Sequence, residues 1–270
     1  MHLSKASIAD NKKTGMSNTS FAANLKTAFD RDGFVVVREF FDATQVKRIV
    51  DEIDRYVMQV APHVPPAFVM YEDTARPDTL KQIAYIAHYD EALRQFLNEG
   101  PAIRIAETLF GRSARGIELE WFDKPPGASR ATPPHQDGYY FKIAPKEAVT
   151  LWVALDRIDK ENGCIRYVAS SHHLGLRPHV RTDVLGFSQG VSDYGPDDEA
   201  REVAVVAEPG DLLAHHCLTI HRADANSSRR HRRALGLIYY SDRVKEDVEA
   251  RDAYLKNLHA DWKKEGKIRG

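Results

Sequence analysis

The sequence has few of the features that mark secreted or membrane-spanning proteins. Its 270 residues include only two cysteines, Cys164 and Cys217, which form neither a CxxC pair nor a disulfide framework. We expect two buried thiols in a reducing compartment. No apolar run is long enough to cross a bilayer, and the first 21 residues are polar, without the apolar segment of a secretory signal. These absences predict a cytoplasmic protein with no membrane partner.

Neither sign of charge dominates the chain. It carries 38 basic and 39 acidic residues, which gives a formal net charge of −1. The sequence therefore offers no electrostatic basis for binding nucleic acid or an anionic membrane surface. The apolar fraction of 43% is sufficient for a hydrophobic core. We expect a small molecule as the partner, and the oligomeric state stays open.

The chain shows no internal repeat and no low-complexity linker. We expect a flexible tail over residues 1–20 and one domain over residues 21–270. Asp42 and Gln45 have the spacing of a capping box, and apolar residues at helical spacing follow them. The other N-terminal segments are predicted as helix 21–30, strand 33–41, loop 62–78 and helix 88–110.

Short strands dominate the chain from Gly116 onward. Turn signals such as KPPG, DKENG and EPGD separate six β-type runs: GIELEWF, VTLWVAL, GCIRYVA, EVAVVAE, DLLAHHC and RRALGLIYY. This order predicts a β-sandwich or barrel core buttressed by helices at both ends of the chain. Residues 174–200 form a long insertion without clear periodicity, and such insertions are often functional or mobile.

The run PPHQDGYYF contains the most informative motif of the chain. In an extended segment, side chains two residues apart point to the same face, so His135 and Asp137 converge and Gln136 points away. An imidazole and a carboxylate that meet in this way can hold a divalent metal. A second histidine would complete two histidines and one carboxylate, the ligand set of non-haem Fe(II) oxygenases.

The second histidine is expected on a strand downstream. His221 is the best candidate, because it lies near the end of a β-type run that meets a turn rich in Asn and Ser. The alternative for His221 is a hydrogen-bonded core histidine. His215 and His216 compete with it, but they lie in mid-strand, where we expect structural roles.

Oxygenases of this type often use 2-oxoglutarate, whose far carboxylate needs a cation. Arginine suits that role because its planar guanidinium binds a carboxylate through two hydrogen bonds. Arg232 follows His221 by eleven residues, a spacing that a short turn between antiparallel strands would bring close. Arg232 and Arg233 point to opposite faces, so only one of them can face the metal.

Five blocks in order resemble the phytanoyl-CoA dioxygenase (PhyH) family of Fe(II)/2-oxoglutarate oxygenases. They are DGFVVVREFF, FDKPPG, PPHQDGYYF, LWVALDRIDKENGCIRYVASSHHLGLRPH and EPGDLLAHHCLTIHRADANSSRRHRRA. The resemblance covers roughly residues 25 to 242. It implies a double-stranded β-helix, a cupin-like jelly-roll of two facing sheets, with helices packed outside.

The resemblance also implies roles for individual residues. His135, Asp137 and His221 match the family's iron ligands, Arg232 matches its arginine for 2-oxoglutarate, and Lys81 and Trp152 match further co-substrate contacts. The implied cofactors are Fe(II), 2-oxoglutarate and O2. The implied reaction is hydroxylation of a C–H bond with release of succinate and CO2. Related halogenases lack the carboxylate, so Asp137 disfavours halogenation.

The substrate is expected to be a small polar metabolite, such as an amino-acid-like compound or an organophosphonate. Five residues near the metal motif are candidates for contacting it: Tyr71, Glu118, Glu120, Tyr139 and Tyr140. Strand alternation allows only about half of them to face the site. An acyl-CoA or natural-product substrate, a non-oxidative cupin-type metal enzyme and a 2-oxoglutarate-binding sensor are the alternatives.

Overall fold

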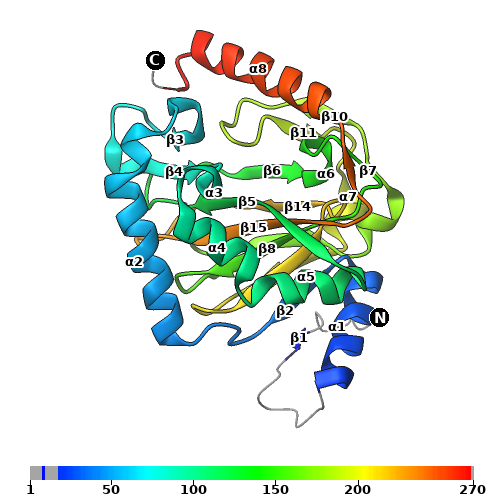
Figure 1. Ribbon diagram of the computed structural model, residues 1–270. Coiled ribbons are helices and arrows are strands. Elements are labelled where there is room, and N and C mark those ends of the chain that lie inside the picture. The colour runs from blue at the N-terminus through cyan, green and yellow to red at the C-terminus, as the bar shows by residue number, and fades with distance from the viewer. Residues whose placement is uncertain (1–7, 10–17, 269–270) are drawn as a thin grey trace.

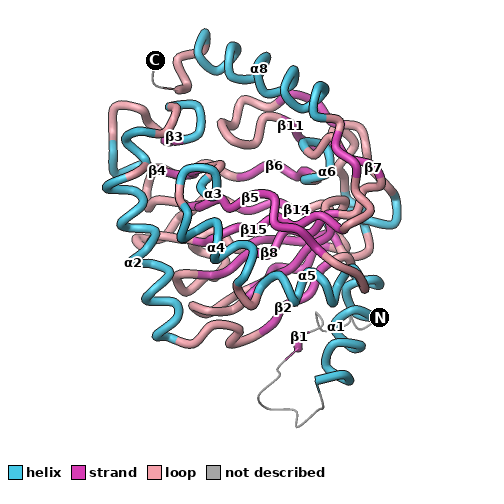
Figure 2. Tube along the Cα trace, viewed as in Figure 1, coloured by secondary structure: helices cyan, strands magenta, loops and turns pink. Residues whose placement is uncertain are grey.

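Two facing, mainly antiparallel sheets form the centre of the computed structural model, which describes residues 8–9 and 18–268 (Figure 1, Figure 2). The larger sheet has the strand order β1 (Ile8–Ala9), β2 (Phe34–Val37), β13 (Leu212–His216), β8 (Ala148–Ala154), β15 (Ala234–Ser241), β5 (Ala114–Phe122), β4 (Leu80–Ile83), β3 (Val69–Tyr71). The smaller sheet has the order β12 (Glu202–Val205), β9 (Ile165–Val168), β14 (His221–Ala223), β6 (Thr132–His135). Neither sheet closes on itself, so the expected all-β core with helices is confirmed as an open jelly-roll.

The central strands of the larger sheet are buried on both faces, because helices cover one face and the smaller sheet covers the other. In β2, Val35 and Val37 point toward the helices, whereas Phe34 and Val36 lie between the sheets. The Phe34 ring stacks on Tyr167 of the smaller sheet at 4.5 Å between centroids. This double burial explains why these runs read as continuous apolar stretches in the sequence.

Helices cover the outer face of the larger sheet and one end of the sandwich (Figure 1). The described helices are α1 (Asn18–Asp32), α2 (Ala43–Gln59), α3 (Ile86–Tyr89), α4 (Glu91–Glu99), α5 (Ala102–Phe110), α6 (Asp137–Tyr140), α7 (Pro196–Glu199) and α8 (Val248–Lys264). The capping box of α2 forms as predicted: the Asp42 side chain accepts from the Gln45 backbone N–H and the Gln45 side chain accepts from that of Asp42. Val46, Ile49 and Ile53 of this helix are buried.

Two predicted elements differ from the structure. The expected helix 88–110 is three helices, because Asp90 caps a new start at α4 and Pro101 follows the end of that helix. Gly111 then ends α5 in the left-handed conformation with φ of 68°. The expected strand 33–41 ends at Val37, since the chain turns at Glu39, where φ is 50°.

The segments expected as loops contain short elements. Residues 62–78 include β3 near their middle, and the insertion 174–200 contains an antiparallel pair and α7. The short pairs outside the two main sheets are β10 (His179–Arg181) with β11 (Gln189–Val191), and β7 (Ile143–Ala144) with β16 (Lys245–Glu246). Single 3-10 turns occupy η1 (Ala61–His63), η2 (Pro66–Phe68), η3 (Pro77–Thr79) and η4 (Ser171–Leu174).

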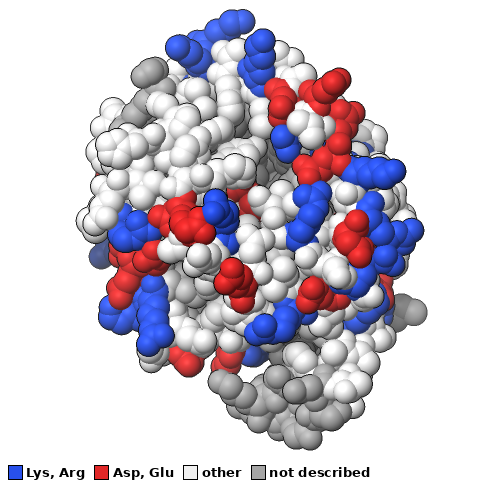
Figure 3. Space-filling model, viewed as in Figure 1, with Lys and Arg blue, Asp and Glu red and all other residues white. Residues whose placement is uncertain are grey.

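Most of the tail predicted over residues 1–20 falls on residues 1–7 and 10–17, which lie outside the described residues. Within that span, Ile8–Ala9 pairs in parallel with β2, and α1 begins at Asn18. Among the described helices, none has the length and apolarity needed to cross a membrane. Basic and acidic side chains are interspersed on the face drawn in Figure 3.

Candidate metal centre and co-substrate cavity

Three side chains that could hold one metal ion meet where the smaller sheet joins α6. His135 ends β6, Asp137 begins α6, and His221 begins β14, where it is the register partner of His135. Nε2 of His135 lies 3.7 Å and Nε2 of His221 lies 3.6 Å from Oδ1 of Asp137. The three ligand atoms all lie within 4.8 Å of one another. This spacing suits a single divalent ion with its other coordination positions open.

Backbone carbonyls fix the tautomers of both histidines. Nδ1 of His135 donates to the Pro133 carbonyl at 2.8 Å, and Nδ1 of His221 donates to the Thr219 carbonyl at 3.0 Å. Each Nε2 therefore carries no hydrogen, and its electron pair faces the centre, where it can bind a metal. Burial lowers the pKa of both imidazoles, which favours the neutral form that binds a metal. This donor set fits Fe(II).

Asp137 is oriented by two hydrogen bonds to its other carboxylate oxygen. Oδ2 accepts from the Thr150 hydroxyl at 2.7 Å and from Nε2 of His215 at 3.0 Å. Nδ1 of His215 lies 3.0 Å from the Tyr167 hydroxyl, which donates to it. Burial opposes ionisation of Asp137, but His221 and His215 outweigh burial and lower the pKa of the carboxyl. Oδ1 is thus left for the ion.

His215 and His216 have the different environments that strand alternation requires. His215 points between the sheets to Asp137, whereas His216 lies toward α1, with its ring 6.1 Å from that of Phe29. The expectation of a purely structural role misses the contact of His215 with Asp137. Thr150 was also missed, because both side chains reach Asp137 through the register of β8 with β13, which no local sequence pattern signals.

A cavity of about 570 Å³ lies beside this centre. Its size is typical of small-molecule sites. His135, Asp137 and His221 line it, and helix α8 contributes Tyr254 and Trp262 to its wall. Figure 1 shows α8 lying across this end of the sandwich.

Arg232 is a buried cation in the cavity wall. Its side chain lies over the Trp152 ring, with the guanidinium carbon 5.1 Å from the ring centroid. Nε has no hydrogen-bond partner among the described residues. Burial lowers the pKa of Arg232 to about 10, so it stays charged at neutral pH. A buried, unpaired guanidinium is unfavourable without an anion, and a carboxylate matches its geometry. Arg233, in contrast, faces away and pairs with Asp156 at 2.8 Å.

Two buried lysines share this end of the cavity. Lys81 is buried rather than solvated, and its ammonium lies 3.1 Å from Glu72. Lys124, which was not among the predicted site residues, donates to the Arg130 carbonyl at 2.6 Å. Burial lowers the pKa of both lysines, and the charge of Arg232 adds to this effect. The sequence signal for Lys124 was its position in FDKPPG. This end of the cavity is therefore suited to an anionic group.

The structure brings three of the five predicted substrate-contact residues to the cavity. Glu118, Glu120 and Tyr140 line it. Tyr71 does not line the cavity. Its chain neighbours Met70 and Glu72 do, and the Tyr71 side chain points to the other side. Tyr139 stacks on His179 at 4.5 Å and is also absent from the lining. We therefore remove Tyr71 and Tyr139 from the candidate substrate contacts.

Glu118 and Glu120 lie two residues apart on β5 and share the face that lines the cavity. Nε2 of Gln82 donates to Oε2 of Glu120 at 3.3 Å. Burial raises the pKa of Glu118. Burial, followed by the charges of Glu118 and Asp137, raises the pKa of Glu120 to about 8. The cavity thus has two polar ends: one contains the cations Arg232, Lys81 and Lys124, and the other contains the carboxyl groups of Glu118 and Glu120.

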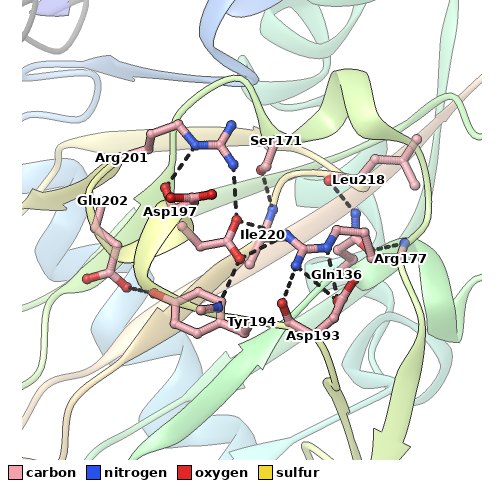
Figure 4. Close-up of polar contacts among 12 residues, drawn as sticks. Gln136, Ser171, Arg177, Asp193, Tyr194, Asp197, Arg201, Glu202, Leu218 and Ile220 are labelled. Atoms are coloured by element: carbon pink, nitrogen blue, oxygen red, sulfur yellow. Dashed lines mark hydrogen bonds and ion pairs between the residues drawn. The ribbon is translucent and has the colours of Figure 1, made fainter.

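Gln136 points away from the centre, as strand alternation predicts, and binds the insertion behind it. Figure 4 shows its contacts with Arg177 and Leu218. Its amide nitrogen donates to the carbonyls of Gly175 and Leu218, and its amide oxygen accepts from the Arg177 backbone N–H at 2.8 Å. Arg177 in turn pairs with Asp193 and with a neighbouring aspartate of α7. The motif therefore supplies the centre on one face and an anchor for the insertion on the other.

Comparisons with known proteins agree on one family. The family model described as phytanoyl-CoA dioxygenase (PhyH) matches residues 29–234. The peroxisomal phytanoyl-CoA dioxygenase of Mus musculus is 25% identical over 235 residues, covering 82% of this chain and 68% of the mouse protein. A probable phytanoyl-CoA dioxygenase of Caenorhabditis elegans is 32% identical over 239 residues, covering 82% and 76%.

A solved structure agrees with these relatives. The epimerase SnoN, crystallised with Fe3+, alpha-ketoglutarate and nogalamycin RO, superposes with a TM-score of 0.70 at 25% identity. The superposition covers 85% of this chain and 87% of SnoN.

Proposed function

Because the chain belongs to the phytanoyl-CoA dioxygenase family of Fe(II)/2-oxoglutarate-dependent oxygenases, we propose that it hydroxylates a C–H bond of a small polar metabolite and releases succinate and CO2. The observation that carries this proposal is the pairing of two sites in one cavity. A group of two histidines and one aspartate lies beside a buried arginine with an unpartnered nitrogen.

In this proposal His135, Asp137 and His221 hold the iron, and Arg232 binds the far carboxylate of 2-oxoglutarate. The iron, with 2-oxoglutarate and O2, supplies the oxidising chemistry when it is bound. The chain supplies two imidazoles, an oriented carboxylate and a cavity beside them. Trp152 supports this role because it packs on the Arg232 guanidinium and leaves the hydrogen-bonding edge free for a carboxylate.

The charges along the cavity favour a polar metabolite over an acyl-CoA. An acyl-CoA would need unpaired cations at the mouth for its phosphates. The more exposed arginines of the lining are committed: Arg115 pairs with Glu246 at 2.7 Å, Arg251 pairs with Glu246 at 3.0 Å and with Asp252 at 3.1 Å, and Arg130 pairs with Asp183 at 2.8 Å. The cations deeper in the cavity surround the proposed 2-oxoglutarate site.

Anaerobic titration with Fe(II), with and without 2-oxoglutarate, tests this function. We expect a weak visible charge-transfer band only when both are present, and succinate formation when O2 is admitted. Metal-dependent turnover without 2-oxoglutarate, together with absence of the band, would favour a non-oxidative cupin-type enzyme. A band without any succinate would favour a 2-oxoglutarate-binding sensor.

A further inference from the structure

The end of the cavity formed by Glu118, Glu120 and Gln82 contains hydrogen-bond acceptors that lack donors. Oε1 of Gln82 and Oε2 of Glu118 are buried, and neither accepts a hydrogen bond of good geometry from the described residues; the imidazole of His88 lies 3.4 Å from Oε2 of Glu118. The Gln82 side chain is more than nine-tenths buried and lines the cavity. Buried polar atoms are almost always paired, so these acceptors indicate that a donor group from a ligand belongs here.

The described chain does not neutralise these carboxylates with a lysine or arginine. Glu120 has no salt-bridge partner among the described residues, and its only side-chain hydrogen bond comes from Gln82. The partner of Glu118 is His88, whose Nδ1 lies 3.4 Å from Oε2 and whose side chain is 58% exposed. Burying carboxylates is costly unless a cation accompanies them. The ligand group that fits is therefore cationic as well as a donor.

The strand register places this end beside the proposed iron site. Glu118 shares a row across the larger sheet with Thr150, and Glu120 shares the next row with Trp152; β15 lies between the two strands in both rows. Two strand spacings separate β5 from β8, which is roughly 10 Å. A ligand group held by the two glutamates therefore lies on the same face of the sheet as Thr150, whose hydroxyl orients Asp137.

Apolar side chains also form part of the cavity wall. Phe68, Phe141, Ile238 and Leu258 contribute to its lining. Three oxygen acceptors on one side of an apolar space are too few to replace the hydration of Mg²⁺ or Ca²⁺, which take six or more oxygen ligands. An organic cation with a hydrocarbon body matches both the acceptors and the apolar walls.

We propose that the substrate carries a protonated amine or guanidinium group, which Glu118, Glu120 and Gln82 bind while its hydrocarbon part extends toward the iron. This proposal rests on the oxygenase function proposed above and narrows its substrate class. It disfavours an organophosphonate, because a phosphonate at this end would meet two carboxyl groups.

Probes that share one skeleton but differ in charge test the proposal. Hexylamine, 1-hexanol and hexanoate are titrated into the anaerobic protein loaded with Fe(II) and 2-oxoglutarate, and binding is measured by calorimetry and by the change in the visible band. We expect hexylamine to bind at least about tenfold more tightly than 1-hexanol, and hexanoate to bind most weakly. Equal affinities, or a preference for hexanoate, would overturn the proposal.

Isosteric variants then locate the binding site. Glu120→Gln and Glu118→Gln should each weaken hexylamine binding by about tenfold and leave 1-hexanol binding unchanged. Glu208→Gln, at a side chain that is 68% exposed on the surface, is the matched control and should change neither affinity. Thermal melts show whether each variant folds. The cation site is wrong if both cavity variants fold and retain wild-type hexylamine affinity, or if Mg²⁺ displaces hexylamine.

The two proposals fail in different ways. If the visible band forms with Fe(II) and 2-oxoglutarate but the amine has no advantage, only the cation site is wrong. If the band does not form at all, the oxygenase function is wrong. A wider panel of diamines and guanidines, scored by stimulated succinate release, should then contain the substrates that turn over fastest.

Discussion

His215 donates a hydrogen bond from Nε2 to Oδ2 of Asp137 across 3.0 Å, and this contact fixes which oxygen of the carboxylate faces the two proposed iron-binding histidines. The Tyr167 hydroxyl sets the tautomer of His215 by donating to its Nδ1 at 3.0 Å. The chain Tyr167–His215–Asp137 therefore orients a proposed ligand from behind, as partners of metal ligands commonly do.

Replacing His215 should weaken iron binding without removing a proposed ligand. His215→Gln loses the imidazole that orients Asp137, and we expect a ten- to hundredfold loss in Fe(II) affinity. Anaerobic titration with Fe(II) measures this loss. His216→Gln is the matched control, because the His216 side chain lies toward α1 and not toward Asp137. It should leave the Fe(II) affinity unchanged. Equal effects of the two substitutions would show that the loss is a general destabilisation of β13 rather than a change at Asp137.

Replacing Asp137 should have a larger effect, because it removes a proposed ligand. We expect Asp137→Ala to lower Fe(II) affinity by at least about a hundredfold and to abolish succinate formation. Bound iron is measured after gel filtration, and succinate is measured after incubation with 2-oxoglutarate and O2. Asp197→Asn, at an exposed position of α7, should leave both unchanged. Unchanged iron content and turnover in Asp137→Ala would disprove the ligand assignment.

Substitutions of Arg232 and of Arg233 should have different effects on 2-oxoglutarate binding. Arg232→Gln removes the buried guanidinium, and we expect the Kd for 2-oxoglutarate to rise by about a hundredfold. Arg232→Lys should recover part of this loss, since an ammonium keeps the charge but not the two-pronged geometry. Arg233→Gln removes an arginine that faces away and pairs with Asp156, so the Kd should not change. The dependence of the visible band on 2-oxoglutarate concentration measures all three constants. A Kd that responds to Arg233 but not to Arg232 would contradict the assignment.

Patterns with local causes could be predicted from the sequence. The capping box at Asp42 forms because both partners are three residues apart on one chain segment. The convergence of His135 and Asp137 follows from the period of an extended strand. Opposite faces for Arg232 and Arg233 follow from the same alternation, and the structure has Arg232 buried over Trp152.

Features that depend on contacts between distant strands could not be predicted. Thr150 and His215 become partners of Asp137 only through the register of β8 with β13. That both Glu118 and Glu120 line the cavity follows from the direction that β5 presents, which no local pattern fixes. Tyr139 lies outside the cavity lining for a local reason: the chain enters α6 at Asp137, so the period of two no longer applies.

The stability of the protein should depend on pH through Glu120. The carboxyl has an ordinary pKa of 4.5 in the unfolded chain, and burial followed by the charge of Glu118 raises its pKa to about 8 in the folded protein. Below pH 4.5 both states are protonated, so the group has no effect. Between pH 4.5 and 8 the unfolded chain releases the proton while the folded protein keeps it, so the free energy of unfolding falls as the pH rises. Above pH 8 both states are ionised and the loss is complete.

Glu120→Gln removes this titration and keeps the shape of the side chain. The Tm of the variant relative to wild type should therefore rise between pH 4.5 and 8 and level off above pH 8. Thermal melts should use metal-free protein in buffers without amines, because a bound cation would lower the pKa of Glu120. The charged or titratable groups that face this carboxyl are Glu118 on its own strand, Asp137 and Tyr85, and all three are unchanged in the variant. Glu208→Gln should show no such trend. A difference in Tm that is constant from pH 4.5 to 9 would mean that Glu120 ionises normally in the folded protein and that the acidic end of the cavity is open to water.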